Sequence, residues 1–205
     1  MAIEWLTLFF QAFGLLFLAE LGDKTQLVIL TLASKGKSSR KLAVGAILGF
    51  AVIVFIGGIV ALLLNTILEV SLISLISGLV FVLIAVFQIG NLIRKRENEI
   101  GQKQIMSYEE EQKSSRWTSD YLAGFLAIVS MELGDKTQVM TIVLSASSAI
   151  PIATLVGSWL ALSALAVLGA YAGNWLSKKV PKKTMDWGAT LLFLVIGIIM
   201  IVANI

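Results

Sequence analysis

The sequence predicts an all-α integral membrane protein with six transmembrane helices, arranged as two inverted three-helix repeats. Its composition, six long apolar segments and a duplicated heptapeptide lead to this prediction. The 205 residues have a mean hydropathy of +0.91, and 58% of them are hydrophobic while only 14% are charged. That is too little charge to cover the surface of a water-soluble domain of this size. We therefore expect nearly the whole chain to lie in a lipid bilayer.

Six segments are long and apolar enough to span a bilayer, which takes about 20 residues each. Trp5, Trp117, Trp175 and Trp187 lie near segment ends, as is typical of interfacial anchors, whereas Trp159 lies inside the fifth segment, where it is expected to pack. No Lys or Arg precedes the first apolar segment, so we expect that segment to be retained and not cleaved as a signal peptide. The predicted spans are 5–33, 42–64, 71–93, 121–146, 150–174 and 185–204.

The basic residues predict the orientation of the spans. Fourteen of the sixteen Lys and Arg residues lie in the first, third and fifth connectors, and the other two are Lys24 and Lys136. The positive-inside rule makes that side cytoplasmic and places both termini outside. Because the basic residues serve as topology signals, the net charge of +3 does not indicate a nucleic-acid partner. The longest connector, 94–120, carries six basic and six acidic residues and is predicted to be a solvated cytoplasmic linker.

The heptapeptide Glu-Leu-Gly-Asp-Lys-Thr-Gln occurs twice, at Glu20–Gln26 and again at Glu132–Gln138. At the same offset, Gly45 matches Gly157 and Gly57 matches Gly169. The chain thus divides into a first repeat, 1–93, and a second repeat, 121–205. Because each repeat has an odd number of spans, the second must cross the membrane in the opposite direction. Inverted repeats are typical of secondary transporters, whose substrate sites lie between the repeats near the middle of the bilayer.

Each copy of the motif places two carboxylates and one ammonium group inside a predicted span. A charge at the centre of a span costs about 2.5–3.5 kcal/mol, so six unpaired charges would cost about 15–20 kcal/mol. A purely structural ion-pair cluster would need equal charges, but here four acids face two lysines. A divalent cation would neutralise the surplus of two negative charges. The i,i+3 spacing puts Glu20 with Asp23, and Glu132 with Asp135, on one helical face.

The rest of the motif supplies smaller polar and flexible groups. Gly22 and Gly134 are explained by close helix packing, by a local helix break that exposes carbonyl oxygens, or by both. Lys24 and Lys136 can pair with the glutamates or extend towards the interface, and we expect them to set the charge of the site. Neutral oxygens at the same depth come from side chains that could instead bond their own backbone, most readily in the threonines. These are Thr25, Gln26, Thr137 and Gln138.

The chain has no Cys and no His, which excludes metal sites built on thiolate or imidazole. A carboxylate-rich oxygen site suits hard cations such as calcium, magnesium or manganese. Met131, next to Glu132, could favour manganese through its thioether, although methionine is also an ordinary apolar filler. A cation binds the deprotonated carboxylates, so metal and protons displace each other. Competition at a site open to each side in turn predicts an antiporter, and the nearest alternative is a cation channel using the same site.

The doubled E-L-G-D-K-T motif in a six-span chain resembles the calcium/manganese–proton exchanger family, whose signature is E-x-G-D-[KR]-[TS]. That family includes Golgi exchangers, chloroplast and cyanobacterial manganese transporters, and bacterial manganese exporters. The resemblance implies a transporter that exchanges manganese or calcium for protons, with no enzymatic activity and no prosthetic group. The small size and the absence of a targeting extension predict a member in the plasma membrane of a prokaryote, where we expect it to export the metal. It leaves open which metal is preferred, the proton stoichiometry and whether the chain forms a homo-oligomer. By position, it implies metal coordination by Glu20, Asp23, Glu132 and Asp135, with motif hydroxyls from Thr25 and Thr137.

Overall fold

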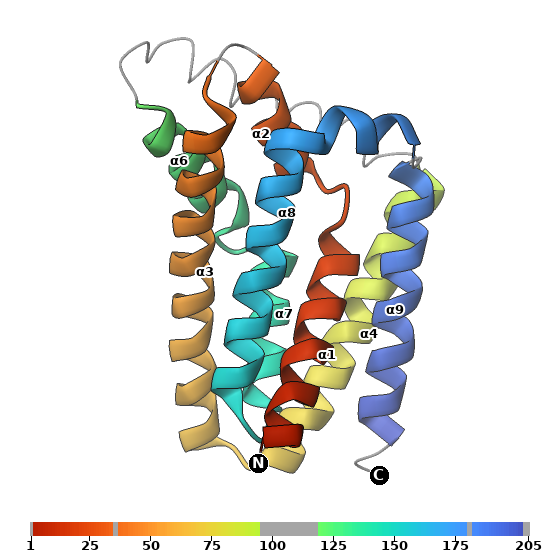
Figure 1. Cartoon of the computed structure of the whole chain (residues 1–205). Helices are drawn as coiled ribbons and strands as arrows, with labels where there is room; N and C mark the ends of the chain where they lie inside the picture. The colour runs from red at the N-terminus through yellow and green to blue at the C-terminus, as the bar shows by residue number, and fades with distance from the viewer. Residues whose placement is uncertain (1, 35–36, 95–118, 180–181, 203–205) are drawn as a thin grey trace.

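A computed structural model describes residues 2–34, 37–94, 119–179 and 182–202, and all regular secondary structure in these ranges is helical (Figure 1). Most of the predicted linker, 95–118, lies outside the described residues. The helices are α1 (Ala2–Glu20), α2 (Lys24–Ser34), α3 (Ser39–Ile67), α4 (Val70–Arg94), α6 (Asp120–Glu132), α7 (Lys136–Ala146), α8 (Pro151–Lys179) and α9 (Lys182–Val202).

Four of these helices, α1, α3, α4 and α8, are long and apolar enough to cross a membrane. Large apolar side chains such as Phe55 and Phe87 are exposed on the outside of the bundle, whereas Glu20 and Glu132 are buried inside it. This distribution is the reverse of that in a water-soluble protein and is the one expected where lipid surrounds the helices. The composition and the fold therefore agree on a multi-pass membrane protein.

The predicted spans 5–33 and 121–146 differ from the structure, because each consists of two helices and not one. The first divides into α1 and α2, and the fourth divides into α6 and α7. Both divisions fall inside the repeated heptapeptide, where a glycine takes a backbone conformation that a continuous helix does not allow. The motif is thereby placed at four helix ends.

The arrangement of the helices is antiparallel (Figure 1). The beginning of α1 and the end of α9 lie at one end of the bundle, which we call the terminus end. Helix α1 runs away from that end, and α6 begins at the opposite end, which we call the linker end, and runs back. The two interrupted segments therefore approach the middle of the bundle from opposite directions.

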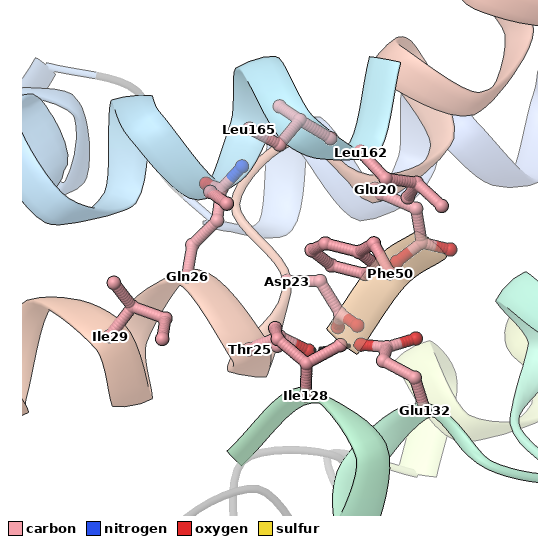
Figure 2. Close-up of a pocket in the computed structure, with 11 residues that line it drawn as sticks. Glu20, Asp23, Thr25, Gln26, Ile29, Phe50, Ile128, Glu132, Leu162 and Leu165 are labelled. Atoms are coloured by element: carbon pink, nitrogen blue, oxygen red, sulfur yellow. Dashed lines mark hydrogen bonds between the residues drawn. The ribbon is translucent and has the colours of Figure 1, made fainter. Parts of the chain in front are cut away.

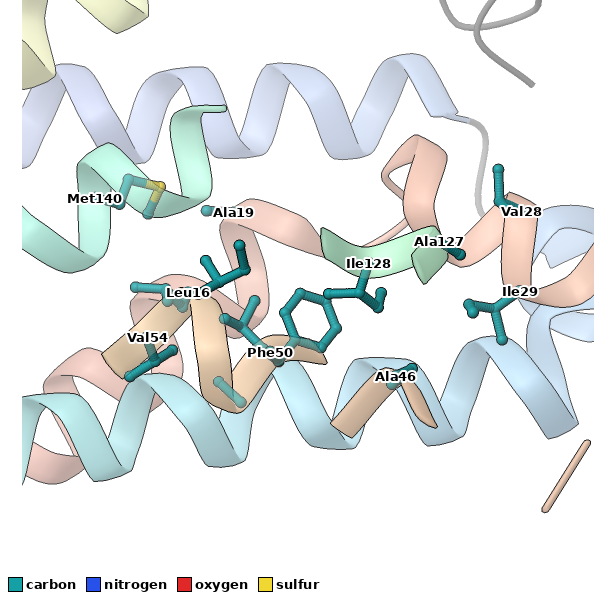
Figure 3. Packing of buried hydrophobic residues seen from close by; sticks show 14 of the residues in the cluster. Leu16, Ala19, Val28, Ile29, Ala46, Phe50, Val54, Ala127, Ile128 and Met140 are labelled. Atoms are coloured by element: carbon teal, nitrogen blue, oxygen red, sulfur yellow. The ribbon is translucent and has the colours of Figure 1, made fainter. Parts of the chain in front are cut away.

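The largest helix–helix contacts join the first half of the chain to the second. Helix α3 packs along α6, α4 along α9, and α1 along α8. Trp159 packs against the core, as expected, and its Nε1 also donates a hydrogen bond to the carbonyl oxygen of Ile47 on α3, at 3.2 Å. The buried core extends through this interface and includes Leu16, Phe50, Ile128 and Met140 (Figure 3).

Candidate metal site

The helix breaks are made by two glycines in the left-handed region of the backbone. Gly22 has φ of 79° and Gly134 has φ of 82°, a conformation that L-residues with a side chain rarely adopt. At Gly134 a Cβ atom would meet nothing within 4 Å. Close packing at Gly134 is therefore wrong, and the helix breaks there; the exposure of carbonyl oxygens as ligands stays a prediction.

The two motif glutamines hold these turns in place. The N–H of Gly22 donates to Oε1 of Gln26 at 2.9 Å, and the N–H of Gly134 donates to Oε1 of Gln138 at 2.6 Å. In each copy the aspartate N–H also donates to the carbonyl oxygen of the glutamate, at 3.2 Å. The amide oxygens considered above as metal ligands thus bond the backbone of their own turn.

Three of the four predicted carboxylates come together at the breaks (Figure 2). Glu20, Asp23 and Glu132 each offer one oxygen, and these oxygens all lie within 4.8 Å of one another. Two oxygens that bind the same calcium ion at 2.3–2.6 Å can be at most about 5 Å apart. The three oxygens therefore fit around a single hard cation. Oδ2 of Asp23 and Oε2 of Glu132 are buried with no hydrogen-bond partner among the described residues.

The fourth carboxylate, Asp135, does not join this group. Its Oδ2 lies 2.8 Å from Nζ of Lys24, which comes from the other copy of the motif. Lys136 reaches in the opposite direction and lies 3.6 Å from Oδ1 of Asp23 and 3.8 Å from Oε1 of Glu20. Each lysine thus pairs with acids of the opposite copy, and not with the glutamate of its own copy. With Lys24 and Asp135 paired, the three remaining carboxylates and Lys136 carry a net charge of −2 when all are ionised.

The motif threonines are both buried, at 5% and 0% exposure for Thr25 and Thr137. Thr25 donates its hydroxyl hydrogen to Oε1 of Glu132, so it orients a carboxylate of the group across the interface between the copies. Thr25 therefore does not make the predicted alternative bond, which would join its hydroxyl to the backbone of its own helix.

A small cavity adjoins the carboxylates and is lined by acids on one side and apolar side chains on the other. The space open to the centre of a water-sized sphere is about 20 Å³, enough for one water molecule or one ion. Phe50 and Leu162 belong to the lining and were missed by sequence reasoning (Figure 2). The internal repeat could have identified them, because Phe50 and Leu162 occupy equivalent positions in the two repeats.

Buried apolar side chains precede and follow each copy of the motif along the bundle axis, and several of them are labelled in Figure 3. Ile29 follows the motif on α2 and Ile128 precedes it on α6, so both lie towards the linker end, and they are 1% and 0% exposed. Leu16 precedes the motif on α1 and Met140 follows it on α7, so both lie towards the terminus end, and both are 0% exposed. Buried apolar side chains thus flank the acidic group on both sides.

Comparison with known protein families agrees with this chemistry. The family model described as divalent cation/proton antiporter GDT1 matches residues 8–95 and 120–205, which is most of the chain. No curated protein and no solved structure matches it. The match confirms the exchanger family that the doubled motif predicted. The chain therefore belongs to the GDT1 family of divalent cation/proton antiporters, which are membrane transporters and not enzymes.

Proposed function

We propose that this antiporter exchanges manganese, calcium or both for protons at the acidic group of Glu20, Asp23 and Glu132, with Asp135 as the fourth acid of the site. The observation that carries the proposal is the grouping of three carboxylates, two of them buried and Asp23 half-buried, whose oxygens lie within 4.8 Å of one another and are faced by Lys136. Their excess charge of −2 equals that of one divalent cation or two protons. One divalent cation or two protons make the group neutral. Without either cargo, the group would keep two negative charges inside hydrocarbon.

The proposal includes six spans in two inverted repeats. Helices α1 and α2 would form one interrupted span, α6 and α7 another, and α3, α4, α8 and α9 one each. Contacts between equivalent positions of the two repeats support this arrangement. A Cβ on Gly45 would collide with the backbone of Tyr121, and a Cβ on Gly157 with the backbone of Phe9, which are the same two positions in the other copy. The hydrogen bond from Trp159 to Ile47 joins equivalent positions, 112 residues apart. A pair of this kind is expected on a pseudo-two-fold axis.

The proposed orientation has both termini outside the cell and the basic connectors in the cytoplasm. The beginning of α1 and the end of α9 lie at the same end of the bundle, which supports the placement of both termini on one side of the membrane (Figure 1). We place the protein in the plasma membrane of a prokaryote. The inward proton gradient of such a membrane would drive the metal out of the cytoplasm.

Alternating access is the proposed mechanism, in which the site opens to one side at a time. The buried apolar residues on both sides of the carboxylates support it, since ions could pass only after one of these layers separates. A channel would require a continuous pathway through both layers at once.

Reconstitution into liposomes tests the proposal. Purified protein is assayed for manganese, calcium and magnesium uptake with a pH dye inside the vesicles. We expect metal entry to be accompanied by proton exit, and both to be lost in Asp23→Asn and Glu132→Gln. Glu4→Gln is the matched control, because Glu4 is exposed in the first turn of α1. Metal flux without proton movement would instead indicate a channel, and no metal-dependent flux at all would contradict the proposal.

A further inference from the structure

The two copies of the motif have the same sequence and the same backbone turn, but their side chains have different partners. Lys24 forms a short ion pair with Asp135, at 2.8 Å. Its counterpart, Lys136, lies farther from Asp23, at 3.6 Å, and is shared with Glu20. Thr25 bonds Glu132, and Gln26 is buried while the equivalent Gln138 is partly exposed.

This difference between the copies decides which carboxylates can bind an ion. The ion pair with Lys24 holds Asp135 away from the other acids, so the group consists of Glu20, Asp23 and Glu132. The adjoining cavity also lies mainly on the side of the first copy, because Thr25 and Gln26 line it (Figure 2). Its lining includes Ile29 and Ile128, which lie towards the linker end.

Nothing within the motifs favours this pairing over its counterpart, because the seven residues are identical in both copies. In the counterpart, Lys136 would pair closely with Asp23 and leave Glu20, Glu132 and Asp135 as the group. The charge would again be −2. The surrounding helices alone must decide which of the two pairings is adopted.

We propose that Lys24 and Lys136 are positioning residues that alternate during transport, each withdrawing the aspartate of the opposite copy in one of two states. This inference rests on the proposed function. The two glutamates remain in the group throughout, while Asp23 serves in the state described here and Asp135 serves in the other. The exchange of one aspartate for the other moves the ligands from one copy to the other. It also prevents all four acids from binding one ion at the same time. An ion bound by four acids would be released more slowly.

The double variant Lys24→Gln/Asp135→Asn tests this inference with little risk to folding, because it removes both charges of one ion pair and leaves no unpartnered charge. The group of Glu20, Asp23 and Glu132 remains intact. Manganese binding to the purified protein is measured by isothermal titration calorimetry, and manganese–proton exchange is measured in liposomes. We expect Kd to stay within about threefold of the unmodified protein while the turnover number falls about tenfold or more. Arg40→Gln, an exposed position on α3, is the matched control.

The single variants Lys24→Arg and Lys24→Gln add a second comparison. Lys24→Arg keeps the charge and is expected to retain most of the turnover, which Lys24→Gln loses. Two results would overturn the inference: a double variant that exchanges at the normal rate, or one whose Kd rises more than about tenfold with turnover unchanged. The second result would make Asp135 a simple ligand of the described state. Failure of the proposed function is distinguishable, because then the unmodified protein itself would show no coupled exchange.

Discussion

The turn at Gly134 permits a prediction whose size can be worked out from the structure. Its φ of 82° lies in the left-handed region, where an L-residue with a Cβ costs about 1–2 kcal/mol. A Cβ at this position would meet nothing within 4 Å, so Gly134→Ala adds no collision to that cost. We therefore expect Gly134→Ala to lower the free energy of unfolding by about 1–2 kcal/mol.

Gly14→Ala is the matched control, because Gly14 lies inside α1 and a Cβ there also meets nothing within 4 Å. Alanine is favoured over glycine inside a helix by about 0.5–1 kcal/mol, so this variant should be as stable as the unmodified protein or more so. Gly134→Asn should lose less than Gly134→Ala, since asparagine tolerates the left-handed region. Tryptophan fluorescence during unfolding by sodium dodecyl sulfate in mixed micelles measures all three. Equal stabilities for Gly134→Ala and Gly14→Ala would refute the strain argument.

Three further predictions concern the site. Glu132→Gln should weaken manganese binding in calorimetry by about tenfold or more, because affinity for hard cations depends on the number of charged ligands; an unchanged Kd would remove Glu132 from the site. Manganese affinity should fall as the pH is lowered, because protons and metal compete for the same carboxylates, by up to about tenfold per pH unit for each proton displaced. Calorimetry in buffers of different ionisation enthalpy should detect the released protons, and a pH-independent Kd would contradict direct competition. Phe50→Ala should increase the metal-independent proton leak of the liposomes, because it removes a 4% exposed ring from the cavity wall. Phe55→Ala, at a 69% exposed position on the same helix, should not, and equal leaks would show that Phe50 does not seal the site.

The meeting of the acidic segments was predictable from the sequence for a physical reason. Charged groups inside a membrane need partners, and apart from Asp186 near the start of the last predicted span, every charged residue within the predicted spans belongs to one of the two copies of the motif. The separation of Asp135 from the other three acids was not predictable. Two identical heptapeptides contain no information that favours Lys24–Asp135 over Lys136–Asp23, so the choice must come from the helices around them.

The apolar part of the site was hidden for a different reason. Phe50 faces the acidic cavity and Phe55 is exposed on the outside of the same helix, yet both lie in one continuous apolar segment. In a water-soluble protein the contrast between polar and apolar residues reveals which face of a helix is inside. A membrane helix has apolar residues on both faces, and that contrast is lost. The helix breaks were easier to foresee, because Gly22 and Gly134 recur at the same place in both copies.

The packing of the first half of the chain against the second has a consequence for biosynthesis. Glu20 and Asp23 enter the membrane long before their counter-ion Lys136 has been synthesised, and the carboxylate that Thr25 bonds lies 107 residues further along the chain. Helix α4 likewise packs against α9, which is synthesised later. We therefore expect the early helices to stay loosely associated in the bilayer until their partners in the second repeat have been inserted. We also expect the two repeats to fold as one unit, with neither forming a stable domain alone.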